Sequence, residues 1–333
     1  MKILVIGDEK RYLKNADIYK VPDGAILSFH PLEATDDELL KNDSDAEIVL
    51  LDAIVKISAY LIDNMPNLKM LHSEGVGFDG IDLEAATKRG IYVCNNKGCN
   101  AKAVAEQAVL LMLALLRNTV VGDAKVRAGL QIQAKHAAMV NGITELSACK
   151  VGLLGFGDIG RATAKLLRAF GCTVYYYKPN RCEKSVEEEL GVTYLELNEL
   201  AAQSDIVSIH TAVTYETTGM VGKEFLGLMK EGAYLINTAR GEIVDNEALR
   251  EALIEGKIAG AGLDTIYPEP TTADNPVVDL PEGIREKVIY SPHFGGITIQ
   301  GMRRAQKHMW ENVAKIAAGE RPDCIVNNVQ NRG

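Results

Sequence analysis

Three segments in the second half of the chain place charged side chains just after an apolar, strand-like run. Arg240 follows the first run, Asp264 and Glu269 follow the second, and His293 follows the third. Arginine binds a carboxylate through two parallel hydrogen bonds, and histidine supplies a proton near neutral pH. A neighbouring carboxylate can hold the imidazole ring in place. Because doubly wound folds bind ligands at the carboxyl ends of their strands, we expect these side chains to converge.

A glycine-rich turn predicts a dinucleotide site. Gly155, Gly157 and Gly160 form a G-x-G-x-x-G pattern between a strand-like run and an amphipathic helical pattern. In such a turn the first glycine permits the tight bend and the second lets the backbone approach a pyrophosphate. The third allows close packing of helix and strand. The pyrophosphate would then lie at the helix N-terminus, where free N–H groups favour anions.

The residue after the second strand of this motif bears on the choice of cofactor. An Asp or Glu about 20 residues past the glycines usually binds the ribose hydroxyls of NAD. This chain has Lys178, 23 residues after Gly155, with Arg181 close behind. A lysine and an arginine would attract a 2′-phosphate, so the sequence favours NADP(H). In the alternative, both side chains are solvated loop charges and NAD(H) binds through backbone contacts.

The elements that must position these residues alternate along the whole chain. Helical patterns separate ten short apolar runs, at Ile3–Gly7, Ile48–Asp52, Leu68–Ser73, Ile91–Asn95, Lys150–Gly155, Cys172–Tyr177, Asp205–His210, Ala233–Thr238, Ile258–Asp264 and Val288–Ser291. Strands that are apolar on both faces and spaced by helices indicate parallel sheets covered on both sides. The sequence therefore predicts an α/β protein of the doubly wound kind.

Two long helical segments bear on domain organisation. A chain of 333 residues favours two domains. Ala103–Leu116 is apolar almost all round, so we expect it to be buried on all sides, between two domains or against a second subunit. The alternative is an ordinary core helix. Ile299–Ala318 is amphipathic, and two domains joined by two such helices would leave a ligand cleft.

Composition excludes several classes of function. The chain has 36 Lys and Arg against 45 Asp and Glu, a net charge of −9, which disfavours a nucleic-acid partner. Its longest apolar run, Ala108–Leu116, is too short to span a bilayer. The N-terminus enters a strand-like run and has no signal-peptide pattern. Six scattered cysteines without a C-x-x-C pair predict neither a metal site nor disulfides, so we expect a cytoplasmic protein.

Several ordered sequence blocks carry a resemblance to a known family. Over nearly its whole length the chain resembles the D-isomer-specific 2-hydroxyacid dehydrogenases. The matching blocks are Gly75–Asp82, Asn100–Glu106, Gly155–Gly160, Met229–Gly241, Gly262–Pro270 and Ser291–Gly296. The resemblance implies hydride transfer between NAD(P)(H) and C2 of a 2-oxo acid or D-2-hydroxy acid.

The same resemblance implies roles for individual residues. Arg240, Glu269 and His293 match the catalytic set, and Asp264 matches the residue that faces the nicotinamide ring. The backbone N–H groups of the loop around Val76 and Gly77 would bind the substrate carboxylate, together with Arg240 and His293. The expected cofactor-binding residues are Gly155, Phe156, Gly157, Asp158, Ile159, Gly160, Lys178, Asn180, Arg181, His210, Thr211, Ala212, Thr238, Ala239, Arg240, Asp264 and His293.

The resemblance also implies a topology. Residues 1–101 and 298–333 would form a flavodoxin-like substrate domain, into which a Rossmann cofactor domain at residues 102–297 is inserted. It further implies a homodimer, with the helix at 103–116 near the subunit contact.

Other interpretations stay open. The same fold serves dinucleotide-sensing corepressors, so a binding protein is the alternative to an enzyme. Lys97 stands where the family usually has proline, and it either contacts an anionic substrate or is a surface residue. The remaining histidines, at positions 30, 72, 136 and 308, have no partner pattern, and Cys94 and Cys99 lack an activating base. Which 2-hydroxy acid is the substrate does not follow from the sequence.

Overall fold

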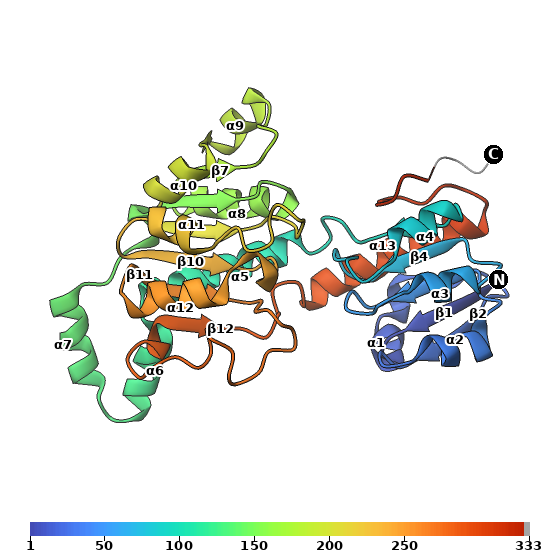
Figure 1. Ribbon diagram of the computed structural model, residues 1–333, viewed down its shortest axis with the longest axis horizontal. Helices are drawn as coiled ribbons and strands as arrows, with labels where there is room; N and C mark the ends of the chain where they lie inside the picture. Colours follow the sequence, from blue (N-terminus) through green and yellow to red (C-terminus); the bar gives the residue numbers. More distant parts are fainter. Residues whose placement is uncertain (330–333) are drawn as a thin grey trace. The chain divides into compact units, whose positions relative to one another are not determined.

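The computed structural model of the protein describes residues 1–329 and contains two compact units. Unit 1 comprises Met1–Asn100 and the chain from Thr298 onward, and unit 2 comprises Ala101–Ile297 (Figure 1). Residues 330–333, which the sequence-based division assigns to the first domain, lie outside the described residues.

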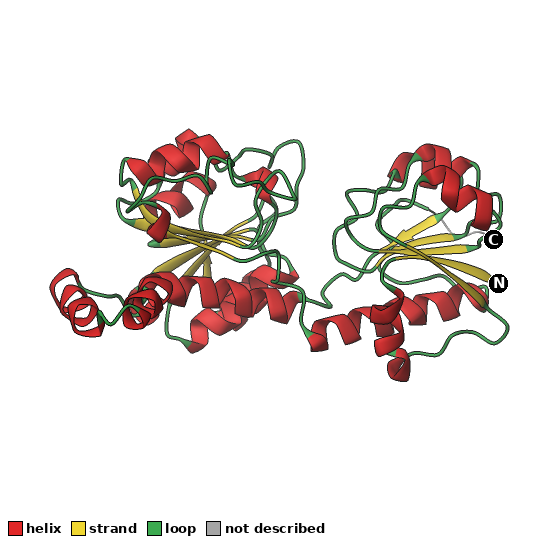
Figure 2. Cartoon of the chain, turned by 90° about the horizontal axis from the view of Figure 1, so that it is seen from below, coloured by secondary structure: helices red, strands yellow, loops and turns green. Residues whose placement is uncertain are grey.

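Unit 1 contains a five-stranded parallel sheet in the order β2-β1-β3-β4-β5. This order is that of flavodoxin-like folds. The strands are β1 (Lys2–Ile6), β2 (Ile26–His30), β3 (Ile48–Leu51), β4 (Met70–Ser73) and β5 (Tyr92–Cys94). The helices are α1 (Glu9–Lys14), α2 (Asp36–Asp43), α3 (Ala59–Asp63), α4 (Leu83–Lys88) and α13 (Ile299–Ala317). Helices cover both faces of the sheet (Figure 2), and buried Trp310 and Val313 of α13 belong to the core on one face.

Unit 2 contains a seven-stranded parallel sheet in the order β12-β11-β10-β9-β6-β7-β8. This is the Rossmann order extended by one strand. The strands are β6 (Lys150–Leu154), β7 (Thr173–Tyr177), β8 (Val192–Tyr194), β9 (Ile206–Ile209), β10 (Ala233–Asn237), β11 (Ile258–Leu263) and β12 (Val288–Tyr290). The helices are α5 (Ala101–Leu116), α6 (Thr119–Arg127), α7 (Gln131–Asn141), α8 (Asp158–Ala169), α9 (Lys184–Leu190), α10 (Leu197–Gln203), α11 (Lys223–Leu228) and α12 (Asn246–Ile254). The predicted fold class, with two doubly wound parallel sheets, is confirmed.

Two strands escaped the sequence analysis for a shared reason. β2 and β8 each lie at an edge of their sheet, and their residues are mostly half-buried or exposed. Edge strands keep polar residues such as Ser28 and His30 within the run, so the run does not stand out as apolar.

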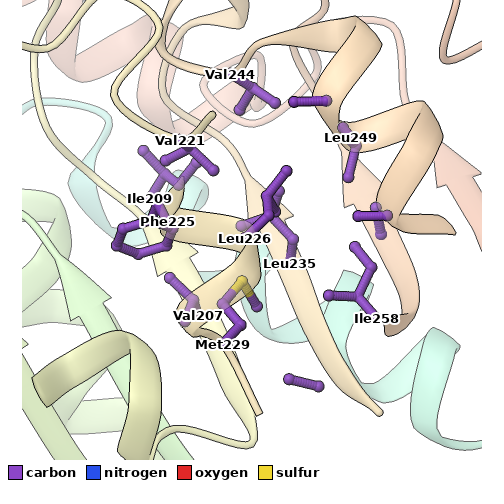
Figure 3. Packing of buried hydrophobic residues seen from close by; sticks show 14 of the residues in the cluster. Val207, Ile209, Val221, Phe225, Leu226, Met229, Leu235, Val244, Leu249 and Ile258 are labelled. Carbon is purple, nitrogen blue, oxygen red and sulfur yellow. The ribbon is translucent and has the colours of Figure 1, made fainter. Parts of the chain in front are cut away.

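Buried side chains fill the space between the sheet of unit 2 and its helices. Figure 3 shows Val207 and Ile209 of β9 and Leu235 of β10 packed against Phe225 and Leu226 of α11. On the other face, α5 packs against α8 and β11. Both faces of the sheet are therefore packed against helices, and the site residues follow its buried strands.

Within one chain α5 is buried over only part of its surface, so burial of the rest against a second subunit stays a prediction. Ala108 and Met112 are fully buried, but Leu110 is 56% exposed. Within this chain α5 is a core helix. One side of it packs against the sheet and α8, and the opposite side is exposed. The two helices that follow are more exposed still, since α6 and α7 contain no buried residue and α7 stands clear of the sheet of its unit (Figure 1).

Within residues 1–329, no single helix is both long and apolar enough to cross a membrane. α5 and α6 meet the length and composition criteria only as a pair, and they are bent by 58° at their junction.

Candidate active site

Three neighbouring strands of unit 2 bring the charged residues predicted from the sequence to one edge of the sheet. β10, β11 and β12 are adjacent and parallel, and Arg240, Asp264 and His293 follow them in that order. The hydrogen bonding between β10 and β11 continues past the end of β11, where the backbone N–H of Asp264 donates to the carbonyl of Asn237 at 2.9 Å. The carboxyl ends of the three strands therefore form one continuous surface.

His293 and Glu269 form a close pair at this edge. Nδ1 of His293 lies 2.7 Å from Oε1 of Glu269. The side chains are 35% and 48% exposed, so both remain open to solvent. His293 has a φ of 56°, in the left-handed region that non-glycine residues seldom adopt. Since Nδ1 is occupied by Glu269, Nε2 is the ring nitrogen left for another partner.

The buried carboxylate of Asp264 organises the turn that carries His293. It accepts hydrogen bonds from the backbone N–H groups of Phe294 at 2.9 Å and Gly295 at 2.8 Å, and from the hydroxyl of Ser291. The carbonyl of Asp264 also accepts the N–H of His293 at 2.9 Å. Three bonds to one carboxylate hold the turn in the unusual conformation that His293 adopts. The sequence analysis assigned Asp264 to the cofactor and missed this contact.

A buried asparagine shapes the turn that carries Arg240. The side chain of Asn237 donates to the carbonyl of Arg240 at 2.9 Å and accepts from the N–H of Ala239 at 3.0 Å. The next residue, Gly241, lies so close to the backbone of Ile266 and Tyr267 that a Cβ would approach them within 2.2–2.4 Å. The Arg240 turn thus packs directly against the segment that leads to Glu269.

The glycine-rich turn has the geometry of a phosphate cradle. Gly155 has a φ of 101°, and a Cβ there would lie 2.6 Å from the backbone of His210 and Thr211. A Cβ on Gly160 would lie 2.5 Å from the carbonyl oxygen of Gly155, whereas one on Gly157 would meet nothing within 4 Å. No side chain caps the N-terminus of α8, so its first N–H groups are open to an anion.

Orphaned polar atoms near the strand ends also fit a bound dinucleotide. Within residues 1–329, buried Nδ1 of His210 and the hydroxyls of Thr238 and Thr265 have no hydrogen-bond partner. Burial lowers the pKa of His210 to about 3, so the ring is neutral. Buried polar groups without hydrogen-bond partners are rare in folded proteins, and a bound ligand would supply the partners that these three groups lack.

The other predicted cofactor residues are placed around this cradle. Phe156 is buried and stacks on Tyr176 at 4.2 Å, and Asp158 and Ile159 open α8. Thr211 and Ala212 follow β9, Ala239 follows β10, and Asn180 is exposed in the loop after β7. All of them lie in unit 2, at or next to the carboxyl ends of its strands.

Lys178 and Arg181 differ in their surroundings. Within the described chain, Lys178 makes no hydrogen bond or ion pair through its side chain. Arg181 binds both carboxylate oxygens of Glu187, with Nε and Nη2 each at 2.8 Å. The hydroxyl of buried Tyr176 also donates to Glu187, at 2.6 Å. The bonds from Arg181, with the added bond from Tyr176, lower the pKa of Glu187 to about 2. Arg181 is therefore already paired, which the sequence did not indicate.

The predicted substrate loop lies in unit 1, after β4. Its carbonyl groups are all occupied: Gly75 accepts from the N–H of Asn96 at 2.9 Å, Val76 from the side chain of Asn95 at 2.7 Å, and Gly77 from the hydroxyl of Ser73 at 2.6 Å. Within the described residues, the N–H groups of Val76 and Gly77 have no acceptor. The loop thus has free backbone hydrogen-bond donors at Val76 and Gly77 and no free carbonyl acceptor. Backbone segments of this kind bind anions.

Lys97 is exposed, and its backbone N–H bonds to the side chain of Asn95 at 3.3 Å. Within residues 1–329, no group of three or more His, Cys, Asp or Glu residues could hold a metal ion.

Comparison with known proteins agrees with this geometry. Residues 109–295 match the NAD-binding domain of the D-isomer-specific 2-hydroxyacid dehydrogenases. A glyoxylate reductase from Thermofilum pendens is 40% identical over 292 residues, which is 87% of this chain and 84% of that protein. The chain belongs to the D-isomer-specific 2-hydroxyacid dehydrogenase family. Membership makes it an oxidoreductase of 2-hydroxy or 2-oxo acids with a nicotinamide dinucleotide cofactor.

Two solved structures of similar proteins extend the comparison to the whole fold of this 2-hydroxyacid dehydrogenase. The TT0316 protein from Thermus thermophilus has a TM-score of 0.83 at 33% identity, covering 98% of this chain and all of that one. D-lactate dehydrogenase from Aquifex aeolicus, complexed with NAD and lactic acid, has a TM-score of 0.80 at 27% identity, covering 96% of each chain.

Proposed function

We propose that this dehydrogenase reduces a small 2-oxo acid to the D-2-hydroxy acid, with His293 as the proton donor. The observation that carries the proposal is the pair of His293 and Glu269 at the same sheet edge as Arg240. When bound, the reduced nicotinamide supplies a hydride to C2 of the substrate. The residues of the phosphate cradle would hold the cofactor. Their open N–H groups favour binding of its pyrophosphate, and the glycines let the backbone approach it closely.

In this proposal His293 gives its Nε2 proton to the carbonyl oxygen as that oxygen gains negative charge. Glu269 accepts the hydrogen bond from Nδ1, which fixes the tautomer and balances the charge of the ring. Asp264 contributes indirectly, because it anchors the turn on which His293 is mounted. The bonds of His293 to the substrate oxygen and to Glu269 would gain strength as charge develops in the transition state, which is the requirement for catalysis.

Arg240 of unit 2 and the loop around Val76 and Gly77 of unit 1 each have a proposed role in recognising the substrate. The planar guanidinium of Arg240 would bind the carboxylate and polarise the carbonyl group. The open N–H groups of Val76 and Gly77 would bind a carboxylate from the backbone. Together these donors select an anionic 2-oxo acid. A carboxylate and a carbonyl group are common to all 2-oxo acids, so the choice among such acids depends on other residues.

We further infer a preference for NADP(H) over NAD(H). Lys178 follows β7 at the position usually held by a ribose-binding carboxylate, and no acidic partner within the described residues neutralises it. A cation there favours a 2′-phosphate, whereas the usual carboxylate would repel it. NAD(H) would still bind through the cradle and the strand ends.

Reduction of glyoxylate is the first reaction to measure, because one relative is named for it. Oxidation of NADPH and NADH is followed optically with glyoxylate, hydroxypyruvate and pyruvate. The wild-type protein should consume cofactor with at least one of these acids. His293→Ala should bind cofactor normally and turn over roughly 10²–10⁴-fold more slowly, the usual range for a positioned proton donor. If wild type binds the dinucleotide but reduces none of these acids, the result favours the alternative function, a dinucleotide-sensing protein.

We also propose that the protein is a cytoplasmic homodimer in which a second copy covers α6 and α7. α7 exposes Ile132, Met139 and Val140, the last two at 74% and 84%, and neither α6 nor α7 contains a buried residue. Short helices with so little packing are marginal in water. Light scattering should give twice the mass of one chain, and replacing Met139 and Val140 by Glu should give a single-chain mass. A monomeric wild type would contradict this.

A further inference from the structure

We propose that Asn96 and His308 are positioning residues for the substrate loop of unit 1. This inference rests on the proposed function, in which the N–H groups of Val76 and Gly77 bind the substrate carboxylate. Neither residue carries one of those donor groups. Asn96 holds the backbone of the loop in shape, and His308 on α13 holds the side chain of Asn96.

Asn96 bonds to the loop through both its backbone and its amide. Its backbone N–H donates to the carbonyl of Gly75 at 2.9 Å. Its side-chain nitrogen donates to the carbonyls of Glu74 at 2.8 Å and Ser73 at 3.4 Å. Asn96 is only 1% exposed, so water does not replace these bonds when they are lost. The bond to the carbonyl of Gly75 fixes the peptide unit that carries the N–H of Val76, and the bonds to the carbonyls of Ser73 and Glu74 hold the two residues that lead into the loop.

These contacts fix the orientation of the amide and hence the tautomer of His308. Because the amide nitrogen faces two carbonyl oxygens, its oxygen must face His308, whose Nδ1 lies 2.8 Å away. An amide oxygen only accepts, so Nδ1 of His308 carries the hydrogen. Burial of the half-covered ring lowers the pKa of His308, which favours the neutral form. The neutral ring with its proton on Nδ1 therefore completes the set of bonds on Asn96.

Two more residues of α13 bond to the same segment. Gln306 donates to the buried carboxylate of Glu74 at 3.2 Å, and Asn312 donates to Nε2 of His72 at 3.0 Å. His72 in turn bonds to the carbonyl of Ser73 at 2.8 Å. α13 therefore contacts this segment through side chains spaced along its length. A helix more than 200 residues away in sequence sets the shape of the substrate loop.

The test compares KM values for glyoxylate and for the reduced cofactor in variants of the full-length protein. His308→Leu removes the Nδ1 donor and leaves the oxygen of Asn96 with only the more distant thiol of Cys99, at 4.0 Å. We expect KM for glyoxylate to rise about tenfold, which corresponds to about 1.4 kcal/mol. KM for the cofactor should stay within twofold, because the cofactor cradle belongs to unit 2. His308→Asn retains a donor at the position of Nδ1 and should restore most of the lost affinity.

Two further variants separate positioning from general damage. Trp310→Phe alters a buried residue of α13 that stacks on Tyr19 and makes no bond to the loop. It should lower the melting temperature and leave KM for glyoxylate unchanged. Asn96→Asp keeps the shape of the side chain but turns oxygen toward the two carbonyls, so it should raise KM even if His308→Leu does not fold.

The outcomes are distinct. The inference is overturned if KM for glyoxylate is unchanged in both His308→Leu and Asn96→Asp, or if Trp310→Phe raises it as much. It is also overturned if His308→Asn behaves like His308→Leu. A wild type that reduces no 2-oxo acid overturns the proposed function itself, and the positioning role with it.

Discussion

Nδ1 of His293 lies 2.7 Å from Oε1 of Glu269, although the two residues are 24 positions apart and follow different strands. The contact assigns a role to each ring nitrogen. Nδ1 binds the carboxylate, and Nε2 is the nitrogen that the proposed mechanism assigns to the substrate. Asp264 holds the turn that carries His293 through separate hydrogen bonds. Glu269 therefore orients the imidazole ring, whereas Asp264 places the backbone of His293.

Glu269→Gln should lower kcat by roughly 100-fold without changing affinity for the reduced cofactor. The amide removes the charge that balances a protonated ring, and its NH₂ group can face Nδ1 and select the wrong tautomer. Steady-state kinetics with the best 2-oxo acid, together with cofactor titration by fluorescence, would check this. An unchanged kcat under conditions where chemistry limits the rate would show that the pair has no part in proton transfer.

Arg240→Lys should not behave as a conservative change. A lysine is a point charge and cannot reproduce the two parallel bonds of a guanidinium to a carboxylate. We expect kcat/KM for the 2-oxo acid to fall about 100-fold, as when a transition-state donor is lost. Affinity for NADPH should hardly change. If cofactor affinity falls instead while kcat survives, Arg240 belongs to the dinucleotide site.

Lys178→Asp should move the cofactor preference toward NADH. A charge-assisted bond to a phosphate contributes about 1.5–3 kcal/mol, so the ratio of kcat/KM values for NADPH and NADH should fall roughly 10- to 150-fold. The preference of the wild type should also shrink as salt rises. Arg181→Ser is the matched comparison, and it should move the ratio less because Arg181 is bound to Glu187. A wild type that favours NADH would contradict the assignment of Lys178.

Glu187→Gln should destabilise the protein at neutral pH and much less in acid. The pKa of Glu187 is lowered to about 2, first by Arg181 and then by Tyr176. Its stabilising effect is therefore complete above the ordinary pKa of a glutamate, about 4.5, and is lost as pH falls from there toward 2. We expect a melting temperature roughly 2–4 °C lower at pH 7, with a smaller difference at pH 3. Glu188→Gln, at an exposed neighbour, should show neither effect. A difference as large at pH 3 as at pH 7 would exclude the ionised carboxylate as its source.

Local sequence patterns were enough to predict the fold class of this protein and several residues of its candidate site. Apolar runs spaced by helical segments predicted two doubly wound parallel sheets, and the structure confirms them. The glycines of the turn after β6 are spaced within a few residues, so the turn could be predicted from the sequence, whereas the close approach of Gly155 to His210 and Thr211 could not. Arg240, Glu269 and His293 could be singled out because each follows a strand, and parallel neighbouring strands end at one edge.

Tertiary structure alone decided which groups touch. The sequence does not show that Asp264 bonds to the turn of His293, that Arg181 faces Glu187, or that His308 reaches Asn96 across 212 positions. Hydrogen-bond partners far apart in sequence are chosen by how helices pack on sheets, and that packing leaves no periodic mark on the chain. The edge strands β2 and β8 were missed for a related reason, since their half-exposed positions tolerate polar residues. Periodicity reports how each segment is buried, whereas the chemistry of the site depends on which buried segments meet.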